Sequence, residues 1–120
     1  MSKHTIDVRA EARHDGRYHA EAFFFVQEAL EHTLRAIGRQ RHVTGRELSE
    51  GARDLAIERF GYMARVVLEE WGIRSTRDIG EIVYLMIKWS LMNKTDEDRI
   101  EDFDDVYDFE TAFDKPFDVH

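Results

Sequence analysis

Apolar residues recur at three- and four-residue steps through most of this chain, and single glycines interrupt the pattern. The clearest stripe comprises Phe23, Val26, Leu30, Leu34 or Thr33, and Ile37. That spacing is typical of one face of an α-helix, whereas no run alternates apolar and polar residues for long enough to indicate a β-strand. We therefore expect an all-α protein, a compact bundle of about four helices.

Glycines and capping residues mark the ends of these helices, which are expected near residues 20–37, 45–60, 62–71 and 76–92. Gly38 supplies a left-handed stop for the first helix. Thr44 and Glu47 have the spacing of a capping box at the start of the second helix. Ser75 or Thr76 can cap the fourth.

The second and third expected helices would form one continuous helix if the chain did not bend at Gly61, because the apolar stripe keeps its phase there. A helix over residues 45–71 would be about 40 Å long. That is too long for a domain whose radius of gyration should be about 14 Å. We therefore expect a break or a kink at Gly61.

The fourth expected helix is apolar on nearly every side, since Glu81, Lys88 and Ser90 are its main polar interruptions. A helix of this kind is buried at the centre of a bundle or at an interface. The central position is the main expectation. In the alternative, residues 79–92 form the contact of a homodimer.

The charges of the chain are unevenly distributed. The net charge is −8, and residues 95–120 hold 11 of the 25 acidic residues but two of the 17 Lys and Arg. The same segment also contains Phe103, Val106, Tyr107, Phe109, Phe113 and Phe117. A disordered acidic tail would be poor in aromatic residues. We therefore expect residues 96–113 to dock on the helices through these rings, with Asp108 capping a short turn.

Length and composition fit one domain: the chain has 120 residues, of which 42% are hydrophobic and 35% charged. We expect a flexible N-terminal segment over 1–14, a helical domain over 15–113 and a C-terminal tail over 114–120.

The absence of cysteine excludes a disulfide framework, thiolate catalysis and iron–sulfur clusters. With no signal peptide and no apolar run near the ~20 residues that cross a bilayer, a cytoplasmic location without membrane contact is expected.

The sequence offers few groups for metal or acid–base chemistry. Glu28 and His32 lie four residues apart on one helical face, with Glu31 beside them. A di-iron bundle would need Glu-x-x-His on two helices, and no such pair exists. We therefore expect a solvated face, no metal site and no cofactor. An enzyme of unknown type that uses Glu28 and His32 stays open as an alternative.

One run of the chain, residues 35–46, is basic and contains no acidic residue. It lies just before and at the start of the second expected helix, where free amides and the helix dipole favour anions. The candidate anion-binding residues are Arg39, Arg41, His42 and Arg46. The competing interpretation is a solvated loop whose arginines pair with nearby acids or with the protein's own tail.

Five segments carry a resemblance to a known family: 15–18 (DGRY), 21–33 (EAFFFVQEALEHT), 42–61 (HVTGRELSEGARDLAIERFG), 71–83 (WGIRSTRDIGEIV) and 106–110 (VYDFE). The chain resembles a family of small uncharacterised proteins associated with planctomycetes and verrucomicrobia. The resemblance covers about residues 15–113. It implies a cytoplasmic bacterial protein whose acidic C-terminal segment belongs to the domain, and it transfers no activity or functional residue.

The charges are unevenly distributed along the sequence, and we find no recognisable set of catalytic residues in it. Both observations favour a non-enzymatic protein-interaction domain. The candidate partner-binding residues lie on the acidic-aromatic segment: Asp104, Asp105, Tyr107, Asp108 and Phe109. The main alternative is binding of nucleic acid or a phosphate ligand through the basic loop 35–46. The net charge of −8 makes nucleic acid the weaker partner.

Overall fold

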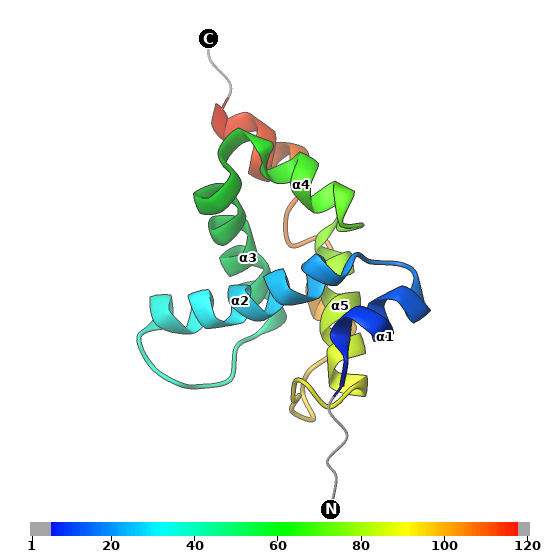
Figure 1. The fold of residues 1–120 in the computed structure, drawn as a ribbon. Helices are drawn as coiled ribbons and strands as arrows, with labels where there is room; N and C mark the ends of the chain where they lie inside the picture. Colours follow the sequence, from blue (N-terminus) through cyan, green and yellow to red (C-terminus); the bar gives the residue numbers. More distant parts are fainter. Residues whose placement is uncertain (1–5, 118–120) are drawn as a thin grey trace, which may run out of the picture.

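A computed structural model describes residues 6–117 and confirms the all-α class. The helices are α1 (Val8–Asp15), α2 (Ala20–Ile37), α3 (Gly45–Phe60), α4 (Ala64–Glu70) and α5 (Thr76–Lys88). Short turns follow as η1 (Gly61–Met63), η2 (Ile100–Phe103), η3 (Glu110–Asp114) and η4 (Lys115–Phe117), where η3 is a π-helical turn. No strand occurs among residues 6–117. In Figure 1, α2 crosses between α3 and α5, and the C-terminal turns lie beside α4.

The expected break at Gly61 is confirmed. Gly61 has φ 55° and ψ −133°, a backbone conformation that glycine adopts readily and other residues rarely. The chain therefore leaves α3 at Phe60, passes through η1 and begins α4 in a new direction (Figure 1). The capping box at the start of α3 is also present, with Thr44 and Glu47 each accepting a hydrogen bond from the other's backbone N–H.

The fourth expected helix is shorter than the range 76–92. Ser75 caps α5 by accepting a hydrogen bond from the Asp78 N–H, but the helix ends at Lys88. Ser90 takes a left-handed φ of 62°, and the Leu91 N–H donates to the Met86 carbonyl at 2.8 Å. This arrangement is a Schellman closure, which serine forms here although glycine usually occupies its left-handed position.

The segment over residues 1–14, expected to be flexible, contains most of helix α1. Asp7 caps α1 by accepting a hydrogen bond from the Ala10 N–H, and Gly16 ends the helix with a left-handed φ of 84°. Ala12 is buried, and Arg9 lies over the ring of Phe24 in α2. Packing of α1 against α2 therefore orders this segment. Residues 1–5 and 118–120, parts of the expected N-terminal segment and tail, lie outside the described residues.

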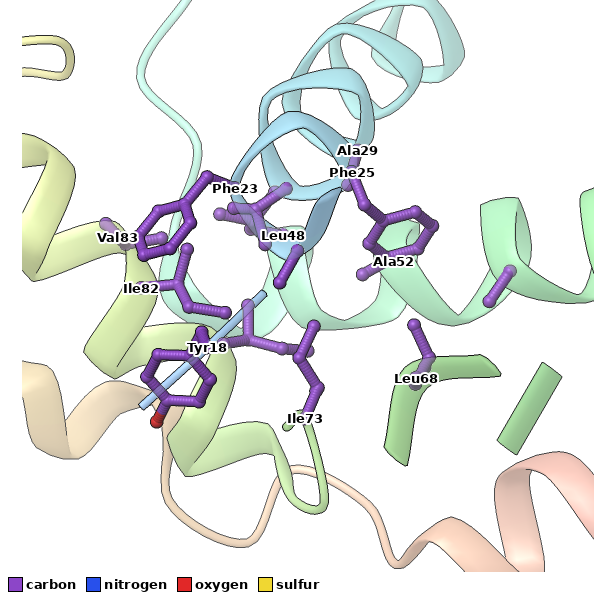
Figure 2. Close-up of a cluster of buried hydrophobic side chains, with 14 of the residues drawn as sticks. Tyr18, Phe23, Phe25, Ala29, Leu48, Ala52, Leu68, Ile73, Ile82 and Val83 are labelled. Carbon is purple, nitrogen blue, oxygen red and sulfur yellow. The ribbon is translucent and has the colours of Figure 1, made fainter. Parts of the chain in front are cut away.

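The side chains of α2 fill the core on two sides (Figure 2). Phe23 points toward Ile82 and Val83 of α5, whereas Phe25 points toward Ala52 of α3. Phe23 and Phe25 are fully buried or nearly so. The aliphatic and aromatic side chains of three helices thus form one core, and α5 occupies the central position that its apolar sequence predicts.

The acidic C-terminal segment docks on this core, as expected, and Phe103 is its main anchor. The ring of Phe103 lies against Gly80 of α5, where a Cβ atom would meet it at 2.7–2.8 Å. The buried Thr76 hydroxyl donates to the Phe103 carbonyl at 2.6 Å and accepts from the Val106 N–H at 3.2 Å. One ring and one hydroxyl therefore attach the segment to the first turns of α5.

We predict that Gly80→Ala destabilises the protein, although alanine favours a helix over glycine by about 1 kcal/mol. The added methyl group displaces the Phe103 ring, and overpacking of this kind typically costs about 1–3 kcal/mol. Urea unfolding measures the change in the free energy of unfolding. In the double variant Gly80→Ala/Phe103→Ala the clash disappears, so the two effects should be clearly non-additive. A Gly80→Ala protein as stable as the wild type would contradict this packing.

Candidate functional site

The aromatic rings of the C-terminal segment point into the protein. Phe103, Phe109 and Phe113 are 1–5% exposed. The Phe109 and Phe113 rings meet edge to face with centroids 4.9 Å apart, and Tyr107 packs against both. Phe117 is the exception, at 39% exposure. The segment therefore buries its apolar side and presents its carboxylates to solvent.

Two of the five candidate partner-binding residues are used inside the chain. Phe109 is buried inside the chain, and its role in partner binding stays a prediction. The Tyr107 hydroxyl donates to the Ser49 carbonyl at 2.7 Å, and the Arg53 guanidinium lies 5.7 Å from the Tyr107 ring centre. The aromatic rings dock the segment because they are apolar, and for the same reason they are not exposed on the surface.

The acidic candidates remain on the surface. Asp104 binds Arg77 at 2.9 Å, and the Asp108 carboxylate accepts from the Thr111 N–H, so it caps η3 as expected. Among residues 6–117, a larger group of exposed acids from this segment forms no ion pair: Asp96, Glu97, Glu101, Asp102, Asp105, Asp108 and Glu110. We call these seven residues the acidic face.

Part of the basic loop 35–46 pairs with the protein's own acids. Arg41 binds Glu47 at 2.7 Å and Arg46 binds Glu50 at 3.4 Å. The His42 Nε2 atom lies 2.8 Å from a carboxylate oxygen of Asp98. Arg35 and Arg39 are exposed and form no ion pair among residues 6–117. Pairing with nearby acids and with the tail therefore accounts for Arg41, His42 and Arg46 but not for Arg35 and Arg39.

Glu28 and His32 both contact residues of α3. Glu28 binds Arg59 of α3, and the His32 Nδ1 atom lies 3.8 Å from Glu58. These contacts link α2 to α3 at the surface. Within the described part of the chain, no group of three or more His, Cys, Asp or Glu residues is placed to hold a metal ion.

A cavity of about 310 Å³ is the feature that the sequence did not predict. It lies between α2, the start of α3, α5 and the segment 91–103, and most of its wall is apolar: Leu30, Leu34, Val43, Leu48, Val83, Ile87, Leu91, Met92 and Phe103. Its polar lining comes from the basic loop and from the acidic segment: Arg41, His42, Lys94, Asp98, Arg99 and Asp102. The volume is at the lower end of the range for small-molecule sites.

Tyr84 of α5 also lines this cavity, and its hydroxyl is enclosed without a hydrogen-bond partner among residues 6–117. A buried polar group left unpaired costs about 1–3 kcal/mol. Burial raises the pKa of Tyr84, and the negative charges of Asp98, Asp102 and Glu101 raise it further. The phenol is therefore neutral at physiological pH. The sequence does not indicate that Tyr84 lines a cavity, because an aromatic residue at helical spacing ordinarily packs in the core.

Helix α5 offers no broad free apolar face for a homodimer. Ile79, Ile82, Val83, Leu85 and Met86 are buried inside the chain. The exposed large apolar side chains of the described residues lie elsewhere: Tyr62, Met63, Val66 and Phe117. No helix within residues 6–117 is long and apolar enough to cross a bilayer.

Searches with this chain find no matching protein-family model, curated protein or solved structure. The resemblance drawn from the sequence segments therefore stays a prediction. The functional argument depends on the geometry of the two surface features, the acidic face and the cavity.

We predict that Glu47 makes the stability of the protein pH-dependent. The Arg41 guanidinium, and then the Thr44 N–H, lower the pKa of Glu47 to about 2. Because this pKa is depressed, the contribution is complete above the ordinary value of about 4.5 and is lost as the pH falls toward 2. Glu47→Gln keeps a capping-box residue but removes the charge. It should cost roughly 1 kcal/mol at pH 7 and less than half of that at pH 3.

Urea unfolding at pH 7, 5 and 3 tests this prediction. The matched control is Glu31→Gln, because Glu31 is exposed on α2 and forms no ion pair among residues 6–117. Equal pH dependence in the wild type and Glu47→Gln would show that the Arg41–Glu47 pair does not contribute to folding.

Proposed function

We propose that this chain is a non-enzymatic protein-interaction domain whose acidic face binds a basic surface of a partner protein. The observation that carries the proposal is that seven exposed carboxylates lie on a segment anchored by the buried rings of Phe103, Phe109 and Phe113. A rigid charged surface steers a complementary partner and loses little conformational entropy on binding. A cytoplasmic location belongs to this proposal.

The composition of the acidic face supports a protein partner rather than a metal ion. Its carboxylates lie along a segment of turns and short helical turns, and no group of three or more described His, Cys, Asp or Glu residues is placed to hold a metal ion. Asp104 and Asp98 are already held by Arg77 and His42, which fixes the backbone between them. The remaining acids are free to meet Lys and Arg side chains of another molecule.

The alternatives from the sequence receive less support. Arg41, Arg46 and His42 are occupied by carboxylates, so a phosphate ligand at the basic loop would have to displace them. A homodimer through residues 79–92 would need side chains that the core already contains. An enzyme based on Glu28 and His32 would first have to break their contacts with α3.

We predict that Glu101→Gln/Glu110→Gln weakens partner binding, whereas Glu31→Gln/Glu70→Gln does not. Both double variants remove two exposed carboxylates and change the net charge equally, but only the first pair lies on the acidic face. Affinity purification from a lysate of the source organism, followed by mass spectrometry, compares the retained proteins. Basic proteins should be retained by the wild type and by the control variant, and lost with the acidic-face variant.

Salt provides the second arm of this experiment. The screening length falls from about 8 Å at 0.15 M to about 3 Å at 1 M ionic strength, so retention should fall steeply across this range. Retention that is indifferent both to salt and to the acidic-face substitutions would refute the proposal. A DNA duplex that binds the wild type through Arg39 and Arg41 would favour the basic-loop alternative instead.

A further inference from the structure

We propose that a second hollow of the surface, a cleft rich in arginine, binds a small organic molecule that carries a phosphate group. The cleft lies between α1, the loop before α2, and the end of α4 with the loop that follows it. Four arginines line it, and we call it the arginine cleft: Arg9, Arg13, Arg17 and Arg74. The acidic face belongs to another part of the chain, residues 96–110, so this inference does not depend on the proposed partner binding.

The arginines meet in the cleft from three segments of the chain. Arg9 and Arg13 lie four residues apart on α1 and therefore on one face of that helix. Arg17 follows in the loop before α2, and Arg74 lies in the loop after α4. Like charges at this helical spacing repel one another. The group is thus a local concentration of positive charge on a chain whose net charge is −8.

Two of the four guanidinium groups are available to a ligand. Arg17 binds Asp15 at 3.0 Å, and Arg9 meets Glu21 at 3.5 Å. Arg13 and Arg74 form no ion pair among residues 6–117. All four arginines are exposed, so a molecule in the cleft can reach them.

The acids of the lining do not cancel this charge. Glu69 is held by Arg65 at 3.0 Å, whereas Glu70 forms no ion pair in the described part of the chain. Two unpaired cations therefore face one unpaired carboxylate, which favours an anionic ligand. A phosphate monoester carries about two negative charges at pH 7, and its oxygens match the fork of a guanidinium group.

The size of the cleft indicates that the phosphate carries an organic part. The volume of about 560 Å³ lies within the usual range for small-molecule sites, and a phosphate group alone would fill a small part of it. Trp71 is a large, partly exposed apolar side chain of the lining. Its ring is held by Phe25 and Phe60, each with its centroid 5.8 Å away. A flat organic group beside Trp71 would cover this ring.

Three probes separate the phosphate from the organic part: phenyl phosphate, inorganic phosphate and phenol. Isothermal titration calorimetry at pH 7 and low ionic strength gives the dissociation constants. We expect phenyl phosphate to bind at one site, inorganic phosphate to compete for that site with a lower affinity, and phenol to show no saturable binding. Absence of saturable binding of phenyl phosphate at millimolar concentrations, or equally tight binding of phenol, would overturn the proposal.

Arg13→Gln and Arg74→Gln test the assignment of the site. Each variant removes one charged donor that has no partner in the free protein, so each should weaken binding of phenyl phosphate roughly tenfold and leave the helix content in circular dichroism unchanged. The matched control is Arg39→Gln, because Arg39 is also exposed and without an ion pair among residues 6–117 but lies outside the cleft. An equal loss of affinity in the control would show a general effect of net charge and refute the assignment.

Glu70→Gln tests the sign of the electrostatic effect. This variant removes the unpaired carboxylate of the lining, so it should strengthen binding of phenyl phosphate, whereas Glu31→Gln on the exposed side of α2 should not. Weaker binding by Glu70→Gln would contradict an anion site in the cleft.

Nucleic acid is the remaining candidate for a group of exposed arginines. A single-stranded oligonucleotide that binds more tightly than phenyl phosphate, and loses affinity in Arg13→Gln and Arg74→Gln, would assign the cleft to nucleic acid. That outcome would overturn the proposal of a small phosphorylated ligand.

Discussion

The contact between Phe103 and Gly80 is the constraint on which the surface of this protein depends. A side chain at position 80 would occupy the space of the Phe103 ring. Thr76, four residues earlier in α5, adds a buried hydrogen bond to the Phe103 carbonyl. Together they fix the point at which the acidic segment meets the helices. Without this contact, residues 91–103 would lose their anchor on α5 and could not form a wall of the cavity.

The helices could be predicted closely from the sequence because their signals are local. The ranges expected near 20–37 and 45–60 agree with α2 and α3, and the stop at Gly38 and the break at Gly61 are both present. Two features of the helices were not predicted. Residues 8–15 are a short helix ordered by contact with α2. The end of α5 depends on Ser90, a residue that rarely takes a left-handed conformation.

The surface was harder to predict, because the sequence shows which residues have charge or rings but not which of them face one another. Aromatic residues in the acidic segment correctly indicated docking, yet this docking removes Phe109 from the surface. The basic loop is visible in the sequence, whereas its pairing is not: Arg41 meets Glu47 six positions away, and His42 meets Asp98 from the far end of the chain. The cavity depends on such distant contacts too, and no local pattern predicts it.

The cavity and the acidic face have a common origin in the segment that leaves α5. The Schellman closure at Ser90 turns the chain back, and residues 91–103 then cross beside α2 and the start of α3 before Phe103 anchors them. The inner side of this crossing contributes Leu91, Met92 and Phe103 to the cavity, while its outer side contributes Glu97 and Glu101 to the acidic face. The cavity wall and the acidic face are therefore two sides of one stretch of backbone, and both depend on the same anchor at Phe103.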